Sequence, residues 1–182
     1  FKEKAKDKSA ILRGHFQGLA HSKVFIQRKN DANGKAIKVL TGSTNFATNG
    51  LYINANHVII FNNENVARWY ADVFDTSFGQ DLIRNFKQTQ LAAGDFVNTG
   101  NNLPDMTIRF SPHPQDVADR FFANISKRIE DAESDVLFAI MDDSSNSSIL
   151  DAVRQQVESD KVFTYGIADK TSDIYLYKPD SK

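Results

Sequence analysis

The sequence predicts an α/β fold with a mixed, mostly parallel sheet flanked by helices. In the second half of the chain, apolar segments of strand length alternate with segments of helical periodicity. Near the start, two apolar segments flank an Asn-Gly turn, which is typical of a β-hairpin. A third strand and a strongly amphipathic helix follow this hairpin, so helices and strands are expected to share one core in each half.

The first 92 residues are expected to contain the hairpin and its helix. Strands are predicted at 19–27, 36–40 and 57–61. The turn falls at 30–34, and Asn62 or Asn63 can cap the helix that follows the third strand. The apolar stripe of this helix comprises Val66, Trp69, Tyr70, Val73 and Phe74. A shorter helix is expected within 79–92.

Residues 93–104 are rich in Gly and Asn, which predicts a linker. Beyond it, strands are expected at 106–110, 135–141, 162–167 and 174–177. One helix begins near Pro114, a residue favoured at the first helical position, and another follows the polar loop at 142–148. Their apolar stripes are Val117, Phe121, Ile125 and Ile129, and Ile149, Leu150, Val153 and Val157.

The bulk composition excludes several classes of site and anchor. The 182 residues suffice for one sizeable core or for parts of two. No cysteine is present, so disulfides, thiolate metal sites and cysteine nucleophiles are excluded. The apolar runs are too short to cross a bilayer, and the start has neither Met nor the apolar core of a signal peptide. The compartment therefore stays unknown.

Charge is unevenly distributed along the chain. Residues 1–43 carry a net charge of +7 and the remainder −8, for a total of −1. A basic segment attracts anionic substrates. Four of its lysines lie within residues 2–8, however, and are typical of a solvated helix face.

Two short motifs in this basic part have the chemistry of a phosphate site. They are His21-Ser22-Lys23 and, beyond the hairpin turn, Gly42-Ser43-Thr44-Asn45. An imidazole can act as nucleophile or acid, an ammonium is a fixed cation, and hydroxyl and amide groups are neutral donors. On a strand, His21 and Lys23 would share one face, as would Ser43 and Asn45. The four side chains are therefore expected to converge at the ends of adjacent strands.

Other polar residues are weaker candidates for the site. His15, His57 and His113 have no matching motif, and Thr44 is expected to face the packed interior. Asp142 and Asp143 end a predicted strand where α/β proteins bind ligands, but capping of the next helix explains them more simply. No Asp, Glu and His cluster has metal-ligand spacing, so neither a metal nor a cofactor is expected.

The chain resembles the phospholipase D superfamily over residues 19–78. The residues that carry the resemblance are Leu19–Ile26, Leu40–Phe46, Asn54–Ile60 and Tyr70–Phe74. An H-x-K motif alone is common, but H-x-K followed by G-S-x-N at hairpin spacing is specific. The resemblance implies a phosphodiesterase that forms a phosphohistidine without metal. It implies catalytic roles for His21, Lys23 and Asn45, and substrate-binding roles for Ser43 and Asn56.

The resemblance also implies that half of the active site lies in this chain. Residues 1–92 match the end of one repeat, and 105–182 the beginning of a second that stops before its own H-x-K. The family site uses two H-x-K motifs, so a homodimer or the remainder of a longer chain would complete it. The chain departs from the family at Arg28, where an Asp is common, and at Ala55, where a carboxylate often orients the imidazole. These departures leave open whether His21 is the nucleophile or the acid.

Two classes of function follow from these observations. The first is a phosphodiester hydrolase or phosphatidyltransferase, with a phospholipid or nucleic acid as substrate. A sequence pI near 6.5 argues mildly against a nonspecific DNA binder. The second is a noncatalytic phosphate-binding or scaffold module, which the single H-x-K and Ala55 favour. A second H-x-K soon after Lys182 in a longer protein would favour the enzyme.

Overall fold

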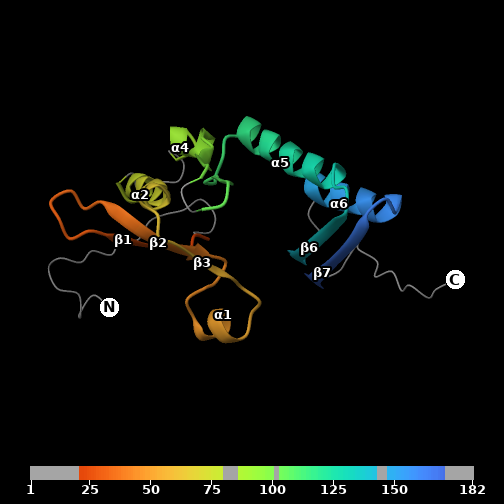
Figure 1. Cartoon of the computed structure of the whole chain (residues 1–182), viewed down its shortest axis with the longest axis horizontal. Coiled ribbons are helices and arrows are strands. Elements are labelled where there is room, and N and C mark those ends of the chain that lie inside the picture. The colour runs from red at the N-terminus through yellow and green to blue at the C-terminus, as the bar shows by residue number, and fades with distance from the viewer. Residues whose placement is uncertain (1–20, 80–85, 101–102, 143–146, 171–182) are drawn as a thin grey trace. The chain divides into compact units, whose positions relative to one another are not determined.

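A computed structural model describes residues 21–79, 86–100, 103–142 and 147–170 (Figure 1). The chain divides into two compact units, Phe1–Pro114 and Gln115–Lys182. The first unit contains β1 (Phe25–Arg28), β2 (Ala36–Gly42), α1 (Thr48–Tyr52), β3 (Val58–Phe61), α2 (Glu64–Gly79), α4 (Gln90–Ala93), β4 (Phe96–Asn98) and β5 (Met106–Ile108). The second contains α5 (Gln115–Glu130), β6 (Asp135–Asp142), α6 (Ser148–Ser159) and β7 (Phe163–Lys170).

The first unit is built on an antiparallel sheet in the order β1-β2-β3. Phe25 pairs with Leu40, and Val39 pairs with Phe61. The predicted strands at 36–40 and 57–61 are confirmed as β2 and β3. The strand predicted at 19–27 is wrong at residues 21–24, which precede β1 and belong to no strand; its first two residues lie outside the described part of the chain.

The turn between β1 and β2 is held by the side chain of Asp31. The Asp31 carboxylate accepts hydrogen bonds from the backbone N–H groups of Asn33 at 3.0 Å and Gly34 at 2.8 Å. Gly34 has a φ of +54°, a left-handed conformation that glycine adopts without a steric cost. This local chemistry confirms the predicted turn at 30–34 and closes the hairpin.

A β-bulge in β2 sets which residues of the hairpin reach the core. Gln27 pairs with Lys38 but Arg28 pairs with Ala36, so Ile37 is an extra residue on β2. Because the bulge reverses the alternation, both Ala36 and Val39 are buried against α2. Val39 is fully buried, as are Val66 and Ala67 on the helix.

Helix α2 covers one face of this sheet (Figure 1) and begins where the sequence predicts. The Asn63 side chain accepts from the backbone N–H of Val66 at 3.0 Å, and its carbonyl accepts from Ala67 at 2.9 Å. Asn63 is therefore the N-cap rather than Asn62. The predicted apolar stripe packs as expected at Val66, Trp69 and Tyr70, whereas Phe74 is largely exposed.

The predicted linker at 93–104 is wrong, because it contains β4, which pairs with β5 as a small hairpin. Phe96 and Phe110 from this hairpin region contact each other at 5.3 Å between ring centroids. Phe96 also packs on Trp69, and Phe110 on Tyr70, both from α2. Aromatic packing therefore ties this segment to the first core, and the two units divide after Pro114.

The second unit pairs two strands in parallel across a helix. In chain order, α5 is followed by β6, α6 and β7, and the α6 crossover allows β7 to run parallel to β6. Ser147 caps α6 by accepting from the N–H of Ile149 at 3.3 Å. The buried Gln156 donates from Nε2 to the carbonyls of Ile129 and Glu130 and so satisfies the end of α5.

The fold is mixed α/β as predicted, but its described strands are not mostly parallel. Three of their four pairings are antiparallel and only β6–β7 is parallel. The β1–β2 and β4–β5 pairs are joined by connections too short for a parallel crossover, whereas the longer β2–β3 connection contains α1. The predicted strand at 174–177 and part of the helix predicted at 79–92 lie outside the described residues; α4 is a separate short helix whose N-cap is Thr89. No described helix has the length and apolarity needed to cross a bilayer.

The end of β2 approaches the start of β3 so closely that only glycine fits between them. Gly42 has a φ of +151°, and a Cβ at this position would lie 2.2 Å from the His57 carbonyl oxygen. We predict that Gly42→Ala lowers the free energy of unfolding by more than about 2 kcal/mol, because strain and a backbone clash add.

Gly34→Ala is the matched control for this substitution, since Gly34 also has positive φ but has no atom within 4 Å of the added Cβ. It should cost only about 1–2 kcal/mol, from the left-handed conformation alone. Urea unfolding followed by the fluorescence of Trp69, the single tryptophan of the chain, measures both. Equal losses for the two variants would show that β2 and β3 separate freely at Gly42.

Burial raises the pKa of the Tyr70 phenol above its ordinary 10.0, while its hydrogen bond to Thr41 acts in the opposite direction. The unfolded chain then loses this proton first, so the stabilisation is complete below the unfolded pKa and is lost as pH rises through the folded pKa. We predict that Tyr70→Phe flattens the fall in urea midpoint between about pH 9 and 11. Tyr52→Phe, at a position 83% exposed, should leave the curve unchanged.

Candidate functional site

The H-x-K motif lies in the segment that leads into β1. His21 is exposed, Lys23 is half-buried, and neither belongs to a strand. The Lys23 ammonium donates a hydrogen bond to the backbone carbonyl of His21 at 2.7 Å. The expectation that a strand places both side chains on one face therefore does not apply to this segment. Instead, the ammonium folds back on the backbone of its own motif.

The G-S-x-N motif lies where β2 ends, and Ser43 is its centre. The Ser43 hydroxyl donates to Asn56 Oδ1 at 3.0 Å and accepts from the backbone N–H of His57 at 3.1 Å. The Ser43 backbone N–H in turn donates to the His57 carbonyl at 3.1 Å. Two of the predicted site residues, Ser43 and Asn56, are thus brought together, and His57 joins them.

Short loops fix the surroundings of this cluster. The Asn56 amide donates to the carbonyl of Gly50 at 2.9 Å. A Cβ on Gly50 would lie 1.9 Å from the carbonyl oxygen of Asn45, so two parts of the loop backbone approach each other at a position that only glycine fits. Thr44 is buried, as predicted, and its hydroxyl donates to the His57 carbonyl at 3.2 Å.

The two motifs lie at the same end of the hairpin, but no polar contact between described residues joins them. The β1–β2 register pairs Phe25 with Leu40, and its continuation would bring Ser22 opposite Ser43. Paired strands lie about 4.8 Å apart, so a continued pairing would bring the motifs within reach of one small ligand. The side chain of Asn45 is exposed, and its backbone carbonyl accepts from Ala47 at 2.7 Å. Convergence of His21, Lys23, Ser43 and Asn45 on one pocket stays a prediction.

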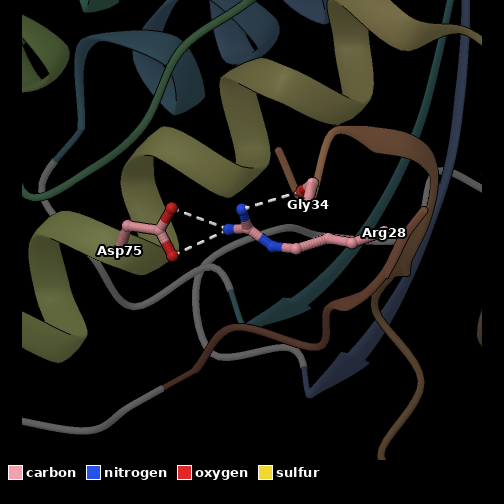
Figure 2. A network of polar contacts seen from close by, with 3 residues as sticks. All are labelled: Arg28, Gly34 and Asp75. Carbon is pink, nitrogen blue, oxygen red and sulfur yellow. Dashed lines mark hydrogen bonds and ion pairs between the residues drawn. The ribbon is translucent and has the colours of Figure 1, made fainter. Parts of the chain in front are cut away.

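Arg28, which stands where the family often has Asp, has a structural partner instead. Its guanidinium donates from Nη2 to both carboxylate oxygens of Asp75 on α2 at 2.7 Å, and from Nη1 to the Gly34 carbonyl (Figure 2). The two side chains are 38% and 57% exposed, so the pair stabilises the fold by at most about 1 kcal/mol. Arg28 therefore orients the hairpin on α2.

Other basic residues of the hairpin turn also pair with α2. Lys35 and Lys29 both form salt bridges with Glu64, in the first turn of that helix. The hydrogen bond from Lys35 is the main cause that lowers the pKa of Glu64. The excess positive charge of residues 1–43 is thus partly neutralised at the turn, whereas Lys23 lies at the motif end and makes no described ion pair.

His57 is the residue of this cluster that the sequence did not single out. It directly follows Asn56 and precedes β3, and β2–β3 pairing places it opposite Ser43. The feature that identifies His57 is its position opposite Ser43 in the pairing of β2 with β3, which a search for sequence motifs does not detect. Within the described ranges, no group of three or more His, Asp or Glu side chains could hold a metal ion.

Comparison of the chain with known protein families, with curated proteins and with solved structures found no match. The family expectation therefore rests on the residues and on the geometry around them.

The different burial of Thr44 and Ser43 predicts different roles for two neighbouring hydroxyls. We predict that Thr44→Val costs about 1 kcal/mol of unfolding free energy, because it removes a buried hydroxyl from the His57 carbonyl. Ser43→Ala should cost about 0.5 kcal/mol or less, because water replaces the hydroxyl at the exposed side chains of Asn56 and His57. Urea midpoints measure both. A larger loss for Ser43→Ala would assign its hydroxyl to stability rather than to a ligand.

Proposed function

We propose that this chain carries a phospholipase D-like site that acts on a phosphodiester through a phosphohistidine intermediate. The observation that carries the proposal is the placement of H-x-K and G-S-x-N at the same end of the β1–β2 hairpin. The proposal includes the family's arrangement of repeats, in which 1–92 ends one repeat and 105–182 begins the next.

Each motif residue has a defined task in this proposal. His21 either attacks phosphorus or protonates the leaving oxygen, and Lys23 binds a nonbridging oxygen as a fixed cation. For that task the Lys23 ammonium exchanges its bond to the His21 carbonyl for one to the phosphate. Asn45 and Asn56 supply neutral donors to the oxygens that gain charge in the transition state, and Ser43, whose hydroxyl hydrogen goes to Asn56 Oδ1, holds Asn56 in place for the substrate. No metal or cofactor takes part.

A second imidazole is needed for the complete reaction, and we propose that a second copy or a longer chain supplies it. An exposed apolar face of the β6–β7 sheet supports contact with further polypeptide. Its members are Leu137, Met141, Phe163, Tyr165 and Ile167, each more than 60% exposed. Parallel sheets are ordinarily covered on both faces, so polypeptide beyond the described residues is expected to cover this one.

A noncatalytic phosphate-binding module is the second candidate. It is favoured by His21, which makes no hydrogen bond or ion pair with a carboxylate among the described residues. A carboxylate partner is what holds a catalytic imidazole in one tautomer and orientation. Ala55, at the position where the family often has the carboxylate, explains why His21 has none among the described residues.

We predict that His21→Ala lowers phosphodiesterase activity by about 10²–10⁴-fold in the complete protein, because one residue supplies the covalent or proton-transfer step. Turnover is measured on bis-p-nitrophenyl phosphate, phosphatidylcholine vesicles and single-stranded DNA, which separates a lipid from a nucleic-acid substrate. The 182-residue chain alone should be poorly active, or active only at concentrations at which it dimerises.

His113→Asn is the matched control, because His113 belongs to neither motif and contacts the Ala92 carbonyl at 2.6 Å in the same unit. It should retain full activity. Full activity of the His21→Ala protein would refute the enzyme and leave the binding module as the better candidate. Strong activity of the chain as a dilute monomer would refute the half-site.

A further inference from the structure

The backbone of His57 is fixed more firmly than an exposed histidine requires. Its N–H donates to Ser43 Oγ, and its carbonyl accepts from both the Ser43 N–H and the Thr44 hydroxyl. The crowded glycine at position 42 brings the end of β2 against the same carbonyl. The imidazole therefore projects from a backbone whose position is set by four neighbouring groups.

The hydrogen bonds around Ser43 favour hydrogen on one particular nitrogen of the His57 ring. The Asn56 amide nitrogen donates to the Gly50 carbonyl, so Asn56 Oδ1 faces Ser43 and takes the single hydrogen of its hydroxyl. One lone pair of Ser43 Oγ then accepts the His57 backbone N–H. The other lone pair faces His57 Nδ1 at 3.3 Å, and this contact is a hydrogen bond when Nδ1 carries the ring hydrogen.

In this tautomer Nδ1 is bound to Ser43, and Nε2 is the ring nitrogen that can contact a ligand. The His57 side chain is exposed, and Nε2 has no hydrogen-bond partner among the described residues. We propose that His57 is a further oxyanion-binding residue of the site, held by Ser43 through Nδ1–H and meeting a phosphoryl oxygen through Nε2. The inference rests on the proposed function, since its ligand is the phosphate group of a phosphodiester.

Binding in this way requires a proton. A neutral ring with hydrogen on Nδ1 has a lone pair at Nε2, which repels an anion, so the ligand enters together with a proton on Nε2. The Ser43 hydroxyl that meets the ring is neutral, and so is Asn56, which accepts its hydrogen. Titratable groups on the neighbouring segments are His21 and Lys23 ahead of β1, and Tyr52 on α1. The proposal therefore predicts proton uptake when an oxyanion binds.

The tautomer is tested by nitrogen NMR of the full chain labelled at histidine. Above the titration of the ring, long-range nitrogen–hydrogen correlations should show Nδ1–H for His57, and addition of sulfate should move its Nε2 signal most. The spectrum of His57→Asn identifies the resonance by its absence. An Nε2–H tautomer would overturn the proposal whatever the binding results.

Binding is tested by calorimetric titration with sulfate, which takes up no proton itself near neutral pH, in buffers of different ionisation enthalpy. Asn at position 57 places an N–H near the position of Nδ1 and so retains the contact with Ser43, whereas Gln reaches the position of Nε2. His57→Asn should keep the urea midpoint but bind roughly tenfold more weakly, through loss of one charge-assisted hydrogen bond. It should also lose most of the proton uptake, while His57→Gln keeps more of the affinity.

The outcomes separate this inference from the proposed function. If His21→Asn and Lys23→Ala weaken binding but His57→Asn binds sulfate with unchanged affinity and proton uptake, the phosphate site stands and the role of His57 falls. If the wild-type chain binds no sulfate, both fall. The same titration with glycerophosphocholine and with a dinucleotide distinguishes lipid from nucleic acid, and proton uptake with either supports the assignment.

Discussion

The close approach of β2 to the start of β3 at Gly42 is the constraint on which the candidate site depends. A side chain at this position would overlap the carbonyl oxygen of His57. Without one, the Ser43 N–H reaches that carbonyl, and the Ser43 hydroxyl reaches the His57 N–H. Steric crowding therefore explains the Gly of the G-S-x-N motif. Its missing side chain lets the next residue, Ser43, bridge the two strands and present a hydroxyl at their end.

The hairpin can present these groups because its other face is firmly packed. The bulge at Ile37 turns both Ala36 and Val39 toward α2, where they meet Val66 and Ala67. At the far end of the hairpin, the ion pair of Arg28 with Asp75 sets the turn against the same helix. Packing thus occupies the turn end and one face, so the strand ends that carry the motifs stay accessible.

The parts of the fold that could be predicted from sequence are those encoded by local patterns. The Asn-Gly turn, the strands at 36–40 and 57–61 and the stripe from Val66 to Tyr70 depend on neighbours in the chain. The β5 strand was predicted at 106–110, but β4 was missed because the Gly- and Asn-rich sequence around it resembles a linker. What organises the β4–β5 hairpin is contact of Phe96 and Phe110 with an earlier helix, which no local window contains.

The residues of the candidate site likewise differ in whether local sequence patterns predict them. Ser43 and Asn56 were predicted from motifs and do meet, whereas His57 required knowledge of which residues pair across β2 and β3. The position of His21 and Lys23 before β1 was not predictable from alternation, because that segment forms no ladder that would fix its faces.

The pairing of charges limits how this site can recognise an anion. Arg28, Lys29 and Lys35 are paired with carboxylates of α2, so their fields largely cancel at the turn end. At the motif end, the described groups include the Lys23 ammonium and several neutral donors, and the neutral donors act only over the length of a hydrogen bond. If the proposed phosphate site exists, these described groups would select a ligand by their fit to the oxygens of one phosphate. A proton carried by His57 would place a second positive charge there only when the ligand arrives.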